Sequence, residues 1–132
     1  GASVRALLAS ALLLALASSG CATALVAAEG AIHRSIAVTQ DTANALCDAK
    51  IKDAESCRLF NVQLIPVIVS AKAFNRAIRE DSAAEVPAML AALLSMRDSA
   101  LAFFPPTMSK AVQARIESTW SLVAGLRKGG AK

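Results

Sequence analysis

An apolar run near the N-terminus is the feature that most constrains how this chain can fold. Residues 6–17, ALLASALLLALA, carry no charge and follow a single basic residue, Arg5. A helix needs about 20 apolar residues to cross a bilayer, whereas the hydrophobic region of an export signal needs only about 7 to 15. The length of the run therefore predicts an export signal rather than a membrane-spanning helix.

The four residues that close this stretch, Ser18-Ser19-Gly20-Cys21, resemble the lipobox of bacterial lipoproteins, in which a small residue precedes a cysteine that is acylated. Gly20 and Cys21 fit the family pattern, and Ser18 stands where the family normally has Leu. The resemblance covers these four residues only. It implies a signal over residues 1–20, a thioether-linked diacylglycerol on Cys21 and, because Ala22 rather than Asp follows, sorting to the outer membrane.

Three other interpretations of the N-terminal stretch stay open. An ordinary signal peptidase could cut after a small-x-small site, either Ala15-Leu16-Ala17 or Ala17-Ser18-Ser19, which would leave Cys21 as a plain thiol. Alternatively, residues 6–28 could remain uncut as a weak membrane anchor. A cytosolic chain with a buried N-terminal helix is the least favoured interpretation, because such a helix should show a polar stripe.

The remainder of the chain has the size and composition of one helical domain. Removal of residues 1–20 leaves 112 of the 132 residues, residues 21–132, a common size for a single domain. Aromatic residues make up only 4% of the chain and Tyr is absent, which favours helices because strands draw on aromatic and β-branched residues. We expect an all-α fold. The net charge of +4 is far below what nucleic-acid binding requires.

The three cysteines are consistent with export. If Cys21 carries lipid, Cys47 and Cys57 remain as a pair that can form a disulfide. In one straight helix ten residues would separate their Cα atoms by about 15 Å, whereas a disulfide needs about 4.4–6.8 Å. The chain must therefore reverse between them, with residues 48–50 ending one helix, Ile51 tucked into the corner and Asp53 capping the next helix. The alternative is two buried free thiols.

Apolar residues at helical spacing divide the mature chain into four predicted helices. The first has one buried stripe over residues 25–46. The second covers residues 54–79, and its middle, residues 64–69, is apolar on every side, which predicts the most buried turn of the domain. Pro66 lies in that middle and predicts either a kink or a helix boundary at Ile65, because proline removes a backbone donor.

The third and fourth predicted helices have recognisable ends. Ser82 and Glu85 have the spacing of a capping box at the start of the third helix. Residues 103–106, FFPP, end it, because a residue before proline is pushed out of the helical region. The fourth begins near Thr107 and stops at residues 129–130, two glycines. Short links between long amphipathic helices favour an antiparallel up-down bundle of about four helices after the signal helix.

Phe103 and Phe104 have two possible uses at the end of the third helix. They could form an exposed apolar tip for interaction, or they could close the end of the core. The second use is the commoner one, and it is the one we expect.

The sequence offers few residues for catalysis or metal binding. His33 is the only histidine, and Glu29 and Asp41 lie one turn before it and two turns after it, which allows at most a weak carboxylate–imidazole pair. A metal site would need a further ligand from another helix. A haem site could pair His33 with a methionine, although methionines at helical spacing usually fill a core; the candidates are Met89, Met96 and Met108. No activated nucleophile and no Gly-rich phosphate loop is present, so we expect no enzyme activity, no cofactor and no metal.

The resemblance and the composition together lead to one expected function and two alternatives. The expected function is a lipid-anchored, non-enzymatic structural or tethering component at the periplasmic face of the outer membrane. Its expected partners are membrane lipid, through acylated Cys21, and an envelope protein, with no nucleic acid. One alternative is a soluble periplasmic bundle that binds a small ligand, haem or a metal. The other is an envelope exclusion or lysis accessory lipoprotein encoded by a phage or plasmid.

Overall fold

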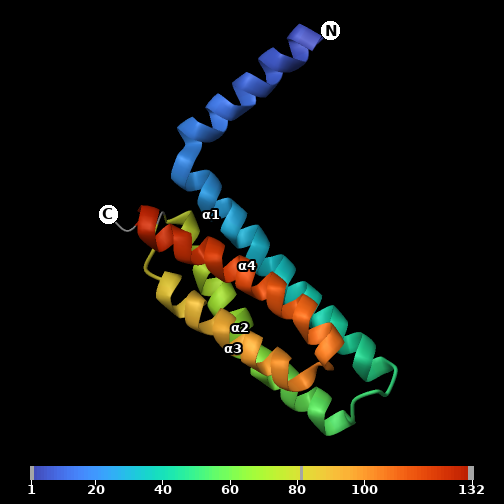
Figure 1. The fold of residues 1–132 in the computed structure, drawn as a ribbon. Helices are drawn as coiled ribbons and strands as arrows, with labels where there is room; N and C mark the ends of the chain where they lie inside the picture. Colours follow the sequence, from blue (N-terminus) through green and yellow to red (C-terminus); the bar gives the residue numbers. More distant parts are fainter. Residues whose placement is uncertain (1, 81, 131–132) are drawn as a thin grey trace.

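The computed structural model describes the backbone of residues 2–80 and 82–130 and the side chains of residues 24–80 and 82–126. Four helices make up most of this part of the chain, and no strand occurs in it. The predicted all-α fold class is therefore confirmed. The helices are α1 (Ala2–Asp48), α2 (Ala54–Arg79), α3 (Val86–Phe103) and α4 (Pro106–Gly130), shown in Figure 1.

Helix α1 runs from Ala2 to Asp48. The predicted boundary between a signal over residues 1–20 and the domain lies outside the residues whose side chains the structure describes. Among the described residues of α1, Leu25 packs against the core and Ala28 is the first that is fully buried.

Helix α2 begins where the sequence predicts but passes through its proline. Asp53 is its N-cap and accepts a hydrogen bond from the backbone amide of Ser56. Pro66 lies inside the helix, so the boundary expected at Ile65 is wrong. Pro66 is exposed to solvent, and the carbonyl of Val62, which loses its partner at this turn, lies on the same side of the helix. Water can satisfy that carbonyl, which explains why the helix tolerates the proline.

Helix α3 ends as predicted but starts differently. Its N-cap is Glu85, whose side chain makes no capping hydrogen bond, so the predicted capping box is wrong. The Ser82 hydroxyl instead accepts a hydrogen bond from the Ala84 amide at 3.2 Å, which closes a local turn before the helix. At the other end Phe104 is extended, with φ −81° and ψ 147°, as expected for a residue before proline.

The four helices lie side by side, each packed against its neighbours in the chain, and α4 also packs against α1. Figure 1 shows the chain reversing its direction at each short connection. Fully buried side chains from all four helices fill the space between them. The largest are Ile32, Phe60, Leu64, Val67, Val86, Met89, Leu93, Met96, Ile116 and Val123.

Buried hydroxyl groups join α1 to α4 across the bundle. Ser35 and Thr119 share a hydrogen bond between their side chains. The Thr119 hydroxyl oxygen also lies 3.0 Å from the carbonyl oxygen of Arg115 in its own helix and 3.3 Å from that of Ala31 in α1. Thr39 donates to the carbonyl of Ser35 at 2.7 Å. Because buried polar groups are costly without partners, these bonds favour one register between the two helices.

Candidate interaction surface

The predicted lipidation site, Cys21, lies within α1, and its side chain is outside the residues whose side chains the structure describes. Its acylation therefore stays a prediction.

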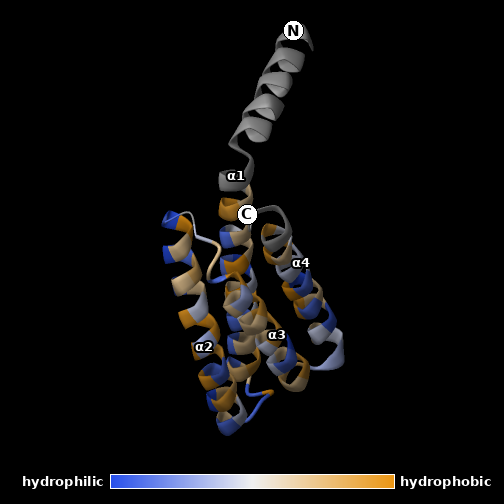
Figure 2. Cartoon of the chain, turned by 90° about the vertical axis from the view of Figure 1, so that its left-hand side faces the viewer, coloured by the Kyte–Doolittle hydropathy of each residue, from blue (hydrophilic) through white to orange (hydrophobic). Residues whose placement is uncertain are grey.

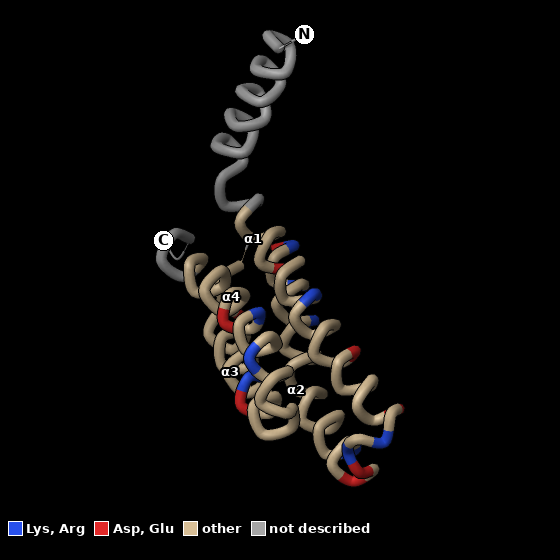
Figure 3. The backbone as a smooth tube through the Cα atoms, turned by 45° about the vertical axis from the view of Figure 1, so that its right-hand side comes forward, with Lys and Arg blue, Asp and Glu red and all other residues tan. Residues whose placement is uncertain are grey.

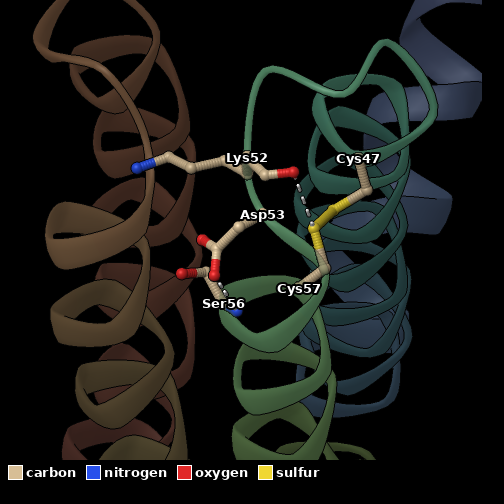
Figure 4. Close-up of a disulfide and its surroundings, with 5 residues drawn as sticks. All are labelled: Cys47, Lys52, Asp53, Ser56 and Cys57. Atoms are coloured by element: carbon tan, nitrogen blue, oxygen red, sulfur yellow. Dashed lines mark hydrogen bonds between the residues drawn. A yellow bond between two sulfur atoms is a disulfide. The ribbon is translucent and has the colours of Figure 1, made fainter.

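Cys47 and Cys57 form a disulfide at the corner between α1 and α2 (Figure 4). Their Cα atoms are 6.2 Å apart, within the range that the bond requires, and the chain reverses between them as predicted. The Cys57 sulfur also lies 3.9 Å from the carbonyl oxygen of Lys52. Ile51 does not tuck into the corner, because its side chain is 63% exposed. That detail of the prediction is wrong.

Backbone hydrogen bonds at this corner explain why α1 ends here. Ile51 donates to the carbonyl of Leu46 at 3.0 Å, and Lys50 donates to the carbonyl of Cys47 at 3.1 Å. Two such bonds around a left-handed residue define a Schellman motif, and Lys50 has a φ of 58°. Glycine is the residue usually found at this position, because other side chains are strained there.

Phe103 and Phe104 are buried and close the core at the end of the bundle, as expected. Phe60 of α2 stacks on Phe103 with ring centroids 4.4 Å apart and meets Phe104 edge to face at 5.6 Å. The Lys52 ammonium lies 5.3 Å from the Phe103 ring centroid, so the aromatic cluster contacts the disulfide corner. The alternative of an exposed phenylalanine tip is wrong.

The candidate metal and haem ligands do not form a site. His33 is exposed, and its Nε2 atom is 3.9 Å from Glu29 Oε1, a loose pair along one helix face. Met89 and Met96 are fully buried among core residues, and Met108 is half-buried against them. Within the described ranges, 24–80 and 82–126, no group of three or more His, Cys, Asp or Glu is placed to hold a metal ion.

A shallow groove of about 460 Å³ lies between α1 and α4. Arg34 and Arg115 lie along it, together with small side chains such as Ser118. Among the residues whose side chains are described, neither arginine forms an ion pair. The groove is open to solvent, so its two guanidinium groups could meet a small anion but would not shield it from water.

The most distinctive surface of the bundle is an apolar stripe along the solvent side of α2. Leu59, Val62, Ile65 and Val69 are 46%, 48%, 56% and 59% exposed. Their spacings of three and four residues place them on one side of the helix, opposite the buried residues Phe60, Leu64 and Val67. We call these four residues the α2 outer face. Isolated exposed apolar residues are common, but an aligned set indicates a contact surface.

The α2 outer face overturns one prediction. The middle of α2 is not the most buried turn of the domain, since Ile65 and Val69 point to solvent. By length and composition α2 and α3 are each apolar enough to cross a membrane, but only 28% of the apolar window of α2 is buried inside the bundle, against 44% for α3. A smaller share of α2 is buried because α2 has a second apolar side, and that side faces solvent.

Charged residues stand at both ends of the α2 outer face. Figure 2 shows α2 hydrophilic at its two ends and more hydrophobic between them. At the start, Glu55 and Arg58 form an exposed ion pair at 2.6 Å, and this hydrogen bonding lowers the pKa of Glu55 and raises that of Arg58. At the end, Lys72 and Arg76 are exposed, and neither forms an ion pair with a described residue.

Sequence reasoning missed this surface, although a signal for it was present. The residues of the α2 outer face recur at helical spacing just as the buried stripe does, so α2 has two apolar stripes rather than one. The two flanking cationic residues could have identified the solvent side, because Lys72 and Arg76 lie on the same side as Ile65 and Val69.

Comparison of the chain with protein-family models, with curated proteins and with solved structures finds no match. The fold, the disulfide corner and the α2 outer face are therefore the observations on which a function can be argued.

Proposed function

We propose that this chain is a lipid-anchored protein of the bacterial envelope whose helical bundle is a non-enzymatic structural or tethering component. The lipid is attached to Cys21, and the bundle is held at the periplasmic face of the outer membrane. An envelope protein is the partner that it tethers.

The disulfide between Cys47 and Cys57 is the observation that supports this proposal most directly. The described core agrees with it, because the stripe of α1 that packs in the bundle includes Leu25, Ala28 and Ile32, all of which a mature chain beginning at Cys21 retains.

The disulfide supports export. Disulfides persist in oxidising compartments such as the periplasm and are rare in the cytosol. Pairing of Cys47 with Cys57 leaves Cys21 as the one cysteine outside the bridge, as a lipid attachment requires.

Labelling with radioactive palmitate in a bacterial host tests the proposal. We expect the full chain to take up label and to fractionate with the outer membrane. The Cys21→Ser variant should take up no label, and its signal should stay uncut or its product should be soluble. Stable anchoring needs more than one acyl chain, so the mature mass should exceed that of a singly acylated product.

A matched control uses the other two cysteines. The double variant Cys47→Ser with Cys57→Ser removes the bridge but leaves the lipobox-like residues in place, so it should label and fractionate as the parent does. Soluble parent protein without label, or label that persists in Cys21→Ser, would contradict the proposal.

The groove between α1 and α4 favours a second candidate function, the binding of a small anionic ligand by a soluble periplasmic bundle. Arg34 and Arg115 supply the charge that such a ligand needs. Thermal shift with inorganic phosphate or a dicarboxylate tests it. A rise in melting temperature that is lost in the double variant Arg34→Ala with Arg115→Ala would support this function, and no rise would contradict it.

A further inference from the structure

Basic residues continue the line of the α2 outer face at both of its ends. Arg58 precedes Val62 by four residues, and Lys72 follows Val69 by three. Arg76 follows Lys72 by a further four. All three basic side chains are exposed, and this spacing places them on the side of α2 that carries the apolar residues. Along its length, the solvent side of α2 is therefore basic, then apolar, then basic.

Cations dominate the charge of α2 itself. Its four basic residues are all exposed, and they are Arg58, Lys72, Arg76 and Arg79. Glu55 is the one acidic residue within the bounds of the helix, and it is paired with Arg58. The other acidic residues nearby in the sequence lie before or after the helix, and they are Asp53, Glu80 and Asp81. The cations of α2 that form no ion pair with a described residue therefore lie from Lys72 onward.

A fluid lipid surface fits the α2 outer face better than a protein partner does. A specific protein interface buries about 800 Å² on each partner, whereas this face is the side of a single helix. A membrane needs no shape complementarity, because each apolar side chain that enters the boundary between headgroups and acyl chains adds to the affinity separately. Lysine and arginine beside such residues can lay their alkyl stems on the apolar surface and extend their charges to the phosphates.

We propose that the α2 outer face is a membrane-contact surface, with which α2 lies flat on anionic phospholipid. Val62, Ile65 and Val69 enter the interface, and Lys72 and Arg76 contact the phosphate groups. The contact is weak and reversible by itself, because the apolar residues are few. The inference does not depend on a lipid at Cys21, although such an anchor would favour the contact by keeping the bundle near the membrane.

The packing of the bundle leaves the α2 outer face free for this contact. Helix α2 packs against α1 and α3, and its outer face is opposite its buried residues Phe60, Leu64 and Val67. Helix α4 also packs against α1 and α3, so it lies across the bundle from α2 (Figure 2). Exposed positions on α4 would therefore face away from the membrane, and they serve as controls.

A fluorescent label that reports on its surroundings tests the contact in the full chain. In a Cys21→Ser background Cys47 and Cys57 are joined, so Ile65→Cys supplies the one free thiol for a nitrobenzoxadiazole label. We expect a blue shift of its emission, and quenching by nitroxide-bearing lipid, when vesicles of phosphatidylglycerol and phosphatidylcholine are added. Leu122→Cys on α4 is the matched control, because Leu122 is 48% exposed and Ile65 is 56% exposed. Its label should show neither change.

The outcomes separate a membrane contact from other occupants of this face. A response at both positions would show that the whole bundle enters the membrane, and a response at neither would show that α2 does not touch it; each would overturn the proposal. An equal response at position 65 with phosphatidylcholine alone would overturn the assignment to anionic lipid. A blue shift there without vesicles, together with a mass that rises with protein concentration, would assign the face to a second copy instead. Because the background carries no lipid at position 21, failure here leaves the proposed anchor untouched.

Removal of one cation tests the electrostatic part of the contact. Lys72→Gln should lower the ratio of lipid-embedded to free label at position 65 about fivefold, since one basic residue near an anionic surface contributes about that factor. Lys110→Gln removes the same charge from an exposed position on α4 and should change the ratio little. Lys72→Arg should keep the parental ratio, and added salt should lower it. Equal effects of Lys72→Gln and Lys110→Gln would mean that only the total charge matters, and would overturn the proposal.

Removal of an apolar side chain tests the other part of the contact. Val69→Ser should lower the same ratio several-fold, whereas Leu101→Ser, at a residue of α3 that is 43% exposed, should leave it unchanged. Both positions are exposed, so circular dichroism should show the same helix content in both variants. Equal losses in the two variants, or no loss in either, would contradict a membrane contact specific to the α2 outer face.

Discussion

Two connections between helices lie at the same end of the bundle, and they are stabilised in different ways. The corner between α1 and α2 covers residues 49–53, is largely exposed and is closed by a covalent bond between Cys47 and Cys57. The corner between α3 and α4 has only Phe104 and Pro105 between its helices and is held by buried aromatic rings. Figure 3 shows acidic and basic residues gathered at the first of these corners.

The two corners are stabilised by different physical effects. A disulfide acts mainly by restricting the unfolded chain, so the first corner can be exposed and polar without loss. The second corner depends on apolar area removed from water, so its side chains must be buried in the folded state. Lys52, whose ammonium lies over the Phe103 ring, is the point where the two corners touch.

The largest expected effect comes from the aromatic corner. Phe60→Ala removes the ring that stacks on Phe103 and leaves a cavity, so the free energy of unfolding should fall by about 3–5 kcal/mol. Denaturant unfolding measures this loss. The control Leu101→Ala, at a half-exposed position, should cost less than about 1 kcal/mol. A Phe60→Ala effect as small as the control would mean that the rings do not hold the corner.

Reduction of the disulfide should have a smaller effect. With about 11 residues in the closed loop, the chain-entropy model assigns the bond about 2.7 kcal/mol, which corresponds to a fall in melting temperature on the order of 10 °C or more. The bundle should still fold when reduced, because its core does not include the bond. Thermal unfolding with and without reductant, combined with thiol counting on the unfolded and unreduced chain, measures both points.

Two results would contradict this account of the corner between α1 and α2. If Cys47 and Cys57 both react with a thiol reagent before reduction, the bridge is absent in solution. If reduction costs more than Phe60→Ala, the covalent corner rather than the aromatic corner dominates the stability of this end.

Lys50→Gly should stabilise the covalent corner by about 0.5–1 kcal/mol. Lys50 has a φ of 58°, which costs about 1–2 kcal/mol for a residue with a side chain, and the greater flexibility of glycine in the unfolded chain offsets part of the gain. Lys50→Ala is the control, because alanine has the same strain and should change little. Equal stability of the two variants would show that the left-handed backbone is not retained in solution.

The features predicted correctly depend on residues that are close in sequence. The cap at Asp53, the reversal between Cys47 and Cys57 and the end of α3 before Pro105 each follow from a few neighbouring residues. The chemistry of turns and caps therefore predicts them without knowledge of the fold.

The features predicted wrongly depend on how the helices pack. The apolar pattern of α2 alone does not decide which of its two apolar sides faces inward, because packing against α1 and α3 makes that choice, and so the exposure of Ile65 and Val69 was missed. Ile51 is exposed although it follows the left-handed residue of a Schellman motif, a position that often makes an apolar contact with the helix. The lipid on Cys21 stays a prediction, since that side chain lies outside the described residues.

The smallest expected effect is that of the Asp53 cap, and it should depend on pH. Hydrogen bonding from Ser56 lowers the pKa of the Asp53 carboxyl below its ordinary value of 3.8. A carboxyl whose pKa is lower in the folded state contributes stability above the unfolded value and loses it as the pH falls through the folded value. Asp53→Ala should therefore lower the melting temperature by a few degrees at neutral pH, with a difference from the parent that shrinks below about pH 4. Asp53→Asn, which keeps an oxygen acceptor without the charge, should show no such pH dependence relative to Asp53→Ala. A difference between parent and Asp53→Ala that grows on acidification would mean that another group, and not this cap, governs the acid sensitivity of the exposed corner.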